Sequence, residues 1–273
     1  MWFWLSFITL LCWSGSDLFS KIGCRDGRDK LSHLKMVIAV GVVMGLHALY
    51  EIVFHQTVIN LHIIWTYLPV SLLYIGSMTL GYLGLRYIEL SISSPICNAS
   101  GALVAIMALL IGQETYPPLV LCAVALVCIG VIGLGVVEAS EDEELRKARQ
   151  LAGNFKYSKS WLALALPIAY CLLDAAGTFS DNLVLNILDE DSANVAYELT
   201  FFLAAVLCFF YITVIKKERL HFRQETPKYI GAIFETAGQF AYIYAIADTE
   251  HMPKSAPIIS AFCEDSFLWS RIF

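Results

Sequence analysis

The chain has 273 residues and a net charge of −6, and it is 58% hydrophobic but only 15% charged. Soluble proteins are about 45–50% apolar and about 25% charged, so this composition excludes an ordinary soluble domain. The apolar residues are gathered into runs of roughly 20 residues, the length that a helix needs to cross the hydrocarbon core of a bilayer. The sequence therefore predicts an all-α polytopic membrane protein.

Nine segments in chain order are long enough to span a membrane as helices. They cover about 2–22, 34–54, 63–85, 92–112, 118–137, 161–180, 194–215, 229–247 and 254–272. Between the fifth and the sixth lies the least hydrophobic stretch, residues 138–160, which carries five acids and five bases. We predict that it is a polar linker between a first transmembrane repeat, residues 1–137, and a second one, residues 161–273.

The basic residues predict the orientation of these helices. When the segments are placed in order, 17 of the 18 lysines and arginines fall on one side of the membrane, and Lys254 alone falls on the other. Because basic loops face the cytoplasm, the polar linker is expected inside and the N-terminus outside. The expected location is the cytoplasmic membrane, as a multi-pass protein.

The two halves of the chain can be laid over each other. Trp4, Leu5 and Asp17 match Trp161, Leu162 and Asp174 at an offset of 157, Tyr82 matches Tyr242, and Ser93-x-Pro95-Ile96 matches Ser255-x-Pro257-Ile258. Five helices is an odd number, so the second copy must be inverted in the membrane, as in many secondary transporters. The overlay pairs five helices with four and predicts a tenth helix near 280–299, past Phe273.

Three short motifs carry a resemblance to a known family. They are Trp13-Ser14-Gly15 before Lys21 in the first helix, Ser94-Pro95-Ile96 to Gly112-Gln113-Glu114 in the fourth, and Ser255-Ala256-Pro257-Ile258 at the start of the ninth. They resemble the drug/metabolite transporter superfamily in its EamA-type ten-helix form. The resemblance implies an inverted five-plus-five bundle with a central cavity, which moves small metabolites or drugs by alternating access. Two departures are the absent tenth helix and the Glu264-Asp265 pair inside the ninth.

Ionisable residues inside spanning helices are costly and usually functional. Asp17 and Asp174 are repeat equivalents, so inversion should place them at mirrored depths, where they could serve two gates or a proton relay. Alternatively, each is a residue near the membrane interface, and Asp17 could form a local ion pair with Lys21, four residues further on. Glu235 and Gln239 share one face of the eighth helix, where they either line a cavity or make an interhelical hydrogen bond.

Other residues are expected along the same pathway. The candidate lining residues are Asn98, Trp13, Tyr170, Tyr82 and Tyr242, and the helix-start motif consists of Ser94, Pro95, Ser255 and Pro257. Packing and interfacial belts are the competing explanation for the aromatic residues.

A row of His47, Glu51 and His55 lies on one face of the second helix, because the residues are four apart. With His62 nearby this row could hold a divalent metal, but no other histidine or thiolate completes a recognised site. We therefore expect no metal and no cofactor. Glu198, early in the seventh helix, is expected to reach water outside.

Small residues in the helices are expected to serve packing. Gly41 and Gly45 are four residues apart, and Gly130, Gly133 and Gly135 lie in the fifth helix, so both groups are predicted to allow close helix contacts. Seven of the eight cysteines lie in apolar runs and are expected to be small buried residues, whereas Cys24 is expected in a loop.

The function that these patterns favour is secondary transport of a small molecule of unknown identity. The expected surroundings are lipid, no catalytic residue is assigned, and no nucleic acid is expected as a partner. Proton coupling and a homodimer stay open. The alternatives are a non-transporting membrane scaffold, an integral membrane enzyme and an inactive truncated transporter.

Overall fold

A computed structural model describes residues 1–24, 29–85, 87, 90–111, 117–140, 144, 161–220, 222–247, 255 and 258–259. All regular structure in these ranges is helical, so the all-α prediction is confirmed. Most of the polar linker and most of the ninth predicted segment, with Pro257, Glu264 and Asp265, lie outside the described residues.

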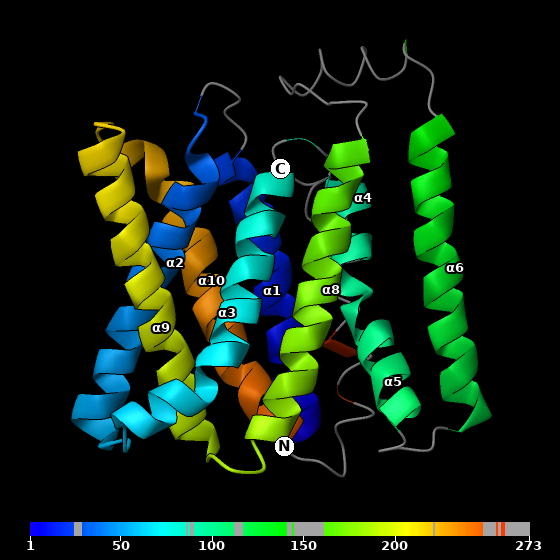
Figure 1. Cartoon of the computed structure of the whole chain (residues 1–273), viewed down its shortest axis with the longest axis horizontal. Helices are drawn as coiled ribbons and strands as arrows, with labels where there is room; N and C mark the ends of the chain where they lie inside the picture. Colours follow the sequence, from blue (N-terminus) through cyan, green and yellow to red (C-terminus); the bar gives the residue numbers. More distant parts are fainter. Residues whose placement is uncertain are drawn as a thin grey trace.

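The helices follow the predicted segments in order, with one exception at the fourth (Figure 1). The first half contains α1 (Trp2–Cys24), α2 (Ser32–Tyr50) with a π-helical turn (Glu51–His55), α3 (Leu61–Gly84), α4 (Leu90–Asn98), α5 (Ser100–Ile111) and α6 (Pro118–Ser140). The second half contains α8 (Trp161–Val184), α9 (Glu190–Phe210) with a π-helical turn (Tyr211–Ile215), and α10 (Phe222–Ala247).

Three helices in the described ranges are long and apolar enough to cross a membrane, namely Ser32–His55, Leu61–Gly84 and Glu190–Ile215. Their lengths are 24, 24 and 26 residues. At about 1.5 Å per residue, each exceeds the roughly 30 Å of a bilayer's hydrocarbon core. These helices indicate a membrane protein.

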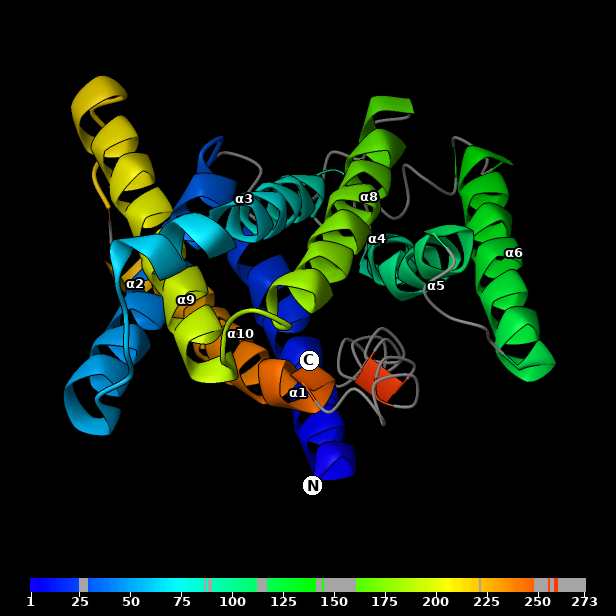
Figure 2. The same cartoon turned by 60° about the horizontal axis from the view of Figure 1, so that its bottom comes forward.

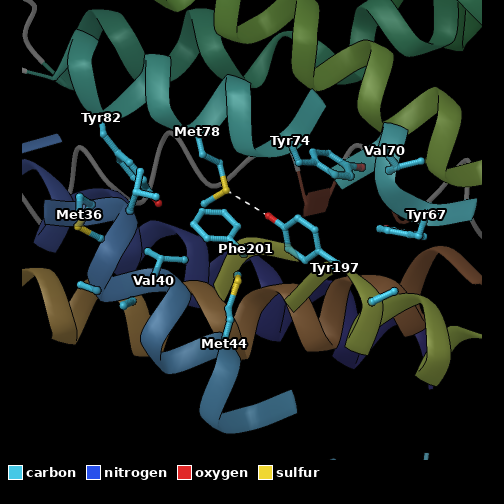
Figure 3. Close-up of a cluster of buried hydrophobic side chains, with 14 of the residues drawn as sticks. Met36, Val40, Met44, Tyr67, Val70, Tyr74, Met78, Tyr82, Tyr197 and Phe201 are labelled. Atoms are coloured by element: carbon cyan, nitrogen blue, oxygen red, sulfur yellow. Dashed lines mark hydrogen bonds between the residues drawn. The ribbon is translucent and has the colours of Figure 1, made fainter. Parts of the chain in front are cut away.

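The helices pack in pairs that join the two halves of the chain. α1 lies along α10, α2 along α9 and α3 along α8 (Figure 1). Between α2, α3 and α9 the fully buried side chains of Met44, Tyr67, Tyr197 and Phe201 form part of one apolar cluster (Figure 3). Because every strong pair contains one helix from each half, neither half forms a separate domain.

Charged residues connect two of the loops at one end of the bundle. The Nζ atom of Lys35 lies 2.9 Å from Asp29, 3.6 Å from Glu225 and 3.7 Å from Glu218. Asp29 precedes α2, whereas Glu218 and Glu225 flank the start of α10. The first and the seventh predicted loops, which are both rich in basic residues, therefore meet at the same end.

The fourth predicted helix, residues 92–112, is divided into two in the structure. Around Ala99 some backbone hydrogen bonds join residues that are three apart, instead of the four of an α-helix. Ala99 N–H donates to the carbonyl of Ile96 at 3.3 Å, and Ala102 N–H donates to that of Ala99 at 3.0 Å. Pro95, inside α4, has no N–H to donate and its ring disfavours a regular preceding turn. The single-helix prediction was wrong because hydropathy alone does not register such a change of turn.

The two groups of glycines differ in what they contact. A Cβ atom on Gly41 would lie 2.5 Å from Ala205 Cβ, and one on Gly45 would lie 2.6 Å from the Phe202 ring, so α2 and α9 do approach closely there. A Cβ on Gly130 or Gly133 would meet no described atom within 4 Å. The close packing predicted for these two α6 glycines is wrong within the described structure.

This difference follows from the position of α6. The helix stands apart from the others, beside α4 and α5 (Figures 1 and 2). Large apolar side chains such as Leu119, Leu126, Ile129 and Ile132 are exposed on it. A helix with apolar residues exposed in this way suits lipid.

Replacing Gly130 with alanine is expected to leave the protein as stable as the wild type or to stabilise it by up to about 1 kcal/mol. The added methyl group meets open space, and alanine loses less backbone entropy than glycine in a helix. Unfolding in detergent micelles with increasing denaturant measures the difference. A clear loss of stability would mean that another helix covers this face.

The cysteines agree only in part with their prediction. Cys24 belongs to the end of α1 and is buried, not in a loop. Cys171 is buried in α8, whereas Cys122 on α6 is exposed because that helix has few neighbours. All the cysteines in the described ranges are free thiols.

Candidate functional site

A cavity of about 140 Å³ lies inside the bundle, lined by residues of α1, α3, α4, α5, α8, α9 and α10. The predicted site residues that line it are Trp13, Asp17, Tyr82, Ser94, Asn98, Tyr170, Asp174, Glu235, Gln239 and Tyr242. Of the others, Pro95 lies within α4 and Ser255 is wholly buried. The structure thus brings residues from both halves to one space.

Asp17 is held by a chain of hydrogen bonds from α4. The hydroxyl of Ser94 donates to Asp17 Oδ2 at 2.8 Å, and the amide of Asn98 donates to Ser94 Oγ at 3.1 Å. Ser94 and Asn98 are four residues apart and therefore share one helix face. The nearby Lys21 donates to the carbonyl oxygen of Leu85 at 2.6 Å. The motif at the start of the fourth helix thus orients the carboxylate of α1.

Asp174 is the carboxyl group that lines the cavity from α8. Tyr170 and Thr178 lie one turn before and after it, so all three residues line the cavity from one helix face. The carboxyl group of Asp174 interacts with the hydroxyl of Ser100, the first residue of α5. The division between α4 and α5 places a serine next to each aspartate, Ser94 for Asp17 and Ser100 for Asp174.

Glu235 and Gln239 enter the cavity from α10, one turn apart. Glu235 interacts with the hydroxyl of Ser16 and lies within Coulombic range of Asp17 and Asp174. Gln239 is buried, and its side-chain nitrogen has no hydrogen-bond partner among the described residues. Both residues line the cavity and Glu235 also contacts Ser16 of α1, so the two roles predicted for this face do not exclude each other.

Aromatic rings form much of the wall. The lining includes Trp13, Tyr74, Tyr82, Tyr170, Tyr197 and Tyr242. The centroids of the Trp13 and Tyr242 rings lie 5.0 Å apart. The Tyr197 hydroxyl donates to the Met78 sulfur at 3.3 Å, which ties the Tyr197 ring of α9 to α3 (Figure 3). The Tyr82 hydroxyl is buried without a hydrogen-bond partner in the described part of the chain.

Asp181 is a buried carboxyl that the sequence analysis missed. Tyr67 donates to its Oδ1 at 2.7 Å and Tyr74 to its Oδ2 at 3.4 Å, and its side chain is 0% exposed. Asp181 follows Asp174 by seven residues and lies on the same side of α8. The predicted sixth helix ended at residue 180, whereas α8 continues to Val184. A predicted helix that ended a few residues later would have included Asp181 and shown that it shares a face with Asp174.

Glu198 does not reach outside water. It is fully buried, His47 Nδ1 lies 2.8 Å from its Oε1, and Asn194 donates to the same oxygen at 3.2 Å. The prediction was wrong because the close α2–α9 contact covers this turn of α9. Depth along a helix does not say which neighbour shields a residue.

The row of His47, Glu51 and His55 is divided between two partners. His47 pairs with Glu198, and His55 Nδ1 lies 2.8 Å from Glu51 Oε2. Within the described ranges, no group of three His, Cys, Asp or Glu side chains has an arrangement that could hold a metal ion. These residues form a polar network that joins α2 and its π-helical turn to α9, in which Glu51 and Glu198 are buried and His55 is exposed.

Comparison with known proteins assigns no family to this chain. No protein-family model matches the sequence, and no curated protein matches it. What the site can do must therefore be argued from its geometry. Three carboxyl groups on separate helices surround an enclosed space with aromatic walls, an arrangement that can hold positive charge or protons inside a helical bundle.

Proposed function

We propose that this chain is a multi-pass membrane protein of the cytoplasmic membrane and a secondary transporter of the drug/metabolite type. In this proposal a small molecule binds in the central cavity and crosses by alternating access. The observation that carries it is the cavity itself, since it is lined by both repeat-equivalent acids, Asp17 and Asp174. Binding sites between the two repeats, near mid-membrane, are typical of secondary transporters.

The packing of the helices supports an inverted repeat. Exchanging the two halves according to the overlay converts the α1–α10 contact into the α8–α3 contact, and both contacts are extensive. The same exchange converts α2–α10 into α9–α3, and the α2–α9 pair into itself. A pseudo-two-fold axis through the α2–α9 contact would produce this pattern.

Individual contacts follow the same rule. A Cβ atom on Gly81 would lie 2.8 Å from the Tyr170 ring, and one on Gly238 would lie 2.5 Å from the Trp13 ring. Tyr170 and Gly238 lie 157 positions after Trp13 and Gly81, the offset that also relates the two aspartates, whereas Tyr82 and Tyr242 are 160 positions apart. In each half, therefore, a glycine contacts an aromatic ring of the other half, and both rings line the cavity.

The meeting of the two basic loops at one end of the bundle supports the orientation. Lys35, at the start of α2, and the lysines that follow α9 lie at this end. The positive-inside rule assigns such a basic end to the cytoplasm. Exposed apolar residues on α6 and on the outer faces of α2 and α9 suit a lipid environment.

Transport by the purified full chain in proteoliposomes tests the proposal. A panel of cationic, neutral and anionic small solutes is applied with and without a pH gradient, and uptake is compared with that of empty liposomes. At least one solute should accumulate. Asp17→Asn and Asp174→Asn should each lower the initial rate by about tenfold or more, because each removes a charge on the pathway.

Glu218→Gln is the matched control, since it removes an exposed acid outside the cavity and should leave uptake unchanged. Full uptake by the double Asp17→Asn, Asp174→Asn variant would contradict the assigned pathway, and no uptake of any solute would contradict transport. If both aspartate variants and Glu235→Gln kept the response to the pH gradient, proton coupling through these groups would be excluded.

A further inference from the structure

The charged side chains that line the cavity are all acidic in the described part of the chain. Asp17, Asp174 and Glu235 contribute carboxyl groups, and no lysine, arginine or histidine is among the described residues that line it. Lys21, one turn after Asp17, is not among the described lining residues, and its ammonium group donates to the carbonyl of Leu85. Asp181 adds a fourth carboxyl group just beyond the wall, on the same side of α8 as Asp174.

Three carboxylates enclosed together repel one another, and burial away from water makes each charge more costly. They are stabilised either by protons or by a cation between them. The same charges oppose the entry of an anion. A ligand whose positive charge lies among the three carboxyls therefore matches the field of this cavity better than a neutral or an anionic one does.

The wall indicates an organic cation in preference to a metal ion. Six aromatic rings line the cavity, and the faces of tyrosine and tryptophan attract ammonium groups. A metal ion would need several oxygen, nitrogen or sulfur ligands converging on one point, and no such group occurs among the described residues. The cavity of about 140 Å³ is close in volume to an engineered cavity of roughly 150 Å³ that binds benzene, which suits a small organic ion.

Two polar groups point independently to a ligand. Tyr82 is 7% exposed and Gln239 5% exposed, both line the cavity, and neither the Tyr82 hydroxyl nor the Gln239 side-chain nitrogen has a hydrogen-bond partner in the described structure. Buried donors are normally satisfied. The hydroxyl and the amide can both donate, so the complementary group is an acceptor oxygen on the ligand.

We propose that the cavity binds a small organic cation, an ammonium compound with a hydroxyl or carbonyl oxygen near its charged nitrogen. The carboxyls of Asp17, Asp174 and Glu235 neutralise the ammonium group, the rings enclose its alkyl surface, and Tyr82 and Gln239 donate to its oxygen. As the substrate class of the transporter, this inference rests on the proposed function, but binding itself is measured without transport.

Binding to the purified full chain in lipid nanodiscs is measured by isothermal titration calorimetry with two probes, choline and ethanolamine. The neutral isostere of choline, 3,3-dimethylbutan-1-ol, has the same shape without the charge, and 3,3-dimethylbutanoate is the anionic comparison. At least one ammonium probe should bind at a single saturable site, about tenfold or more tighter than the isostere, because its charge lies among three carboxyls. The anion should not bind.

Variants separate the roles of the charge and the oxygen. Asp174→Asn and Glu235→Gln should weaken the ammonium probe about tenfold, whereas Glu218→Gln should not change it. Tyr82→Phe and Gln239→Leu should weaken choline but leave the binding of ethyltrimethylammonium, which lacks the hydroxyl, unchanged. A thermal unfolding curve for each variant confirms that it is folded, and Tyr82→Phe removes only one oxygen atom.

Several results would overturn the inference. They are equal binding of choline and its isostere, tighter binding of the anion, binding of neither ammonium probe, and complete displacement of the probe by an equal concentration of sodium or potassium ions. Proteoliposomes distinguish this failure from that of the proposed function. Uptake of a neutral or anionic solute without ammonium binding refutes the cation and leaves transport standing, whereas ammonium binding without flux of any solute refutes transport and leaves the cation standing.

Discussion

Replacing His47 with leucine is expected to lower the free energy of unfolding by about 3–5 kcal/mol, the range for removing one partner of a buried ion pair. His47 Nδ1 lies 2.8 Å from Glu198 Oε1, and its Nε2 lies 3.7 Å from Glu51 Oε1. The imidazole therefore stands between two buried carboxyls. Without it, Glu198 keeps only the amide of Asn194 among the described residues, and Glu51 keeps only His55.

Equilibrium unfolding in detergent micelles measures this loss. Glu198→Leu should cost less than His47→Leu, because it leaves a partly exposed imidazole that becomes neutral, whereas His47→Leu leaves a carboxylate inside the protein. The double variant His47→Leu, Glu198→Leu should recover part of the stability. His62→Leu, at an exposed histidine, is the control and should change stability by no more than about 0.5 kcal/mol. Equal costs for the two single variants would contradict this account.

Replacing Gly41 with alanine is expected to destabilise the protein by about 1–3 kcal/mol, the usual cost of overpacking a well-packed contact. The new Cβ would lie 2.5 Å from Ala205 Cβ and 2.6 Å from the carbonyl oxygen of Phe201. A backbone oxygen cannot rotate away as a flexible side chain would, so α2 and α9 must separate. Gly130→Ala is the matched control, because the same methyl group meets open space on α6.

The displacement should also reach the cavity. Phe201 stacks edge-on with Tyr197 at 5.8 Å between ring centroids, and Tyr197 lines the cavity. Gly41→Ala is therefore expected to weaken ligand binding as well as stability, whereas Gly130→Ala should weaken neither. Unfolding and calorimetry on the same two preparations check both effects. Equal stability of Gly41→Ala and the wild type would show that the α2–α9 contact is looser than the structure places it.

Much of the candidate site was predictable because burial in a helix leaves a clear signal in sequence. A carboxyl group in an otherwise apolar run, as at Asp17, Asp174 and Glu235, stands out by its cost. The spacing of four between Glu235 and Gln239 gave their common face. Asp181 escaped for a local reason, since the predicted helix ended one residue before it.

The contacts that a residue makes with other helices were much less predictable. Glu198 looked like a residue near the outer interface, and the structure places it against His47 of the opposite half. The glycines of α2 and α6 have similar sequence surroundings, but only Gly41 and Gly45 meet another helix. The division of the predicted fourth helix at Ala99 depends on backbone hydrogen bonds between residues three apart, and the hydropathy pattern does not show them.

The sequence by itself determined that the chain is helical, where most helices begin and end, and that Asp17, Asp174 and Glu235 lie inside them. These properties are local, because hydropathy and spacing act along one helix. Only the tertiary structure decided that Asp17, Asp174 and Glu235 line one cavity, together with Tyr82 and Gln239, which each carry a buried polar atom without a partner in the described structure. The reason is geometric: each residue turns a helix by about 100°, so a small rotation changes which neighbours a side chain meets.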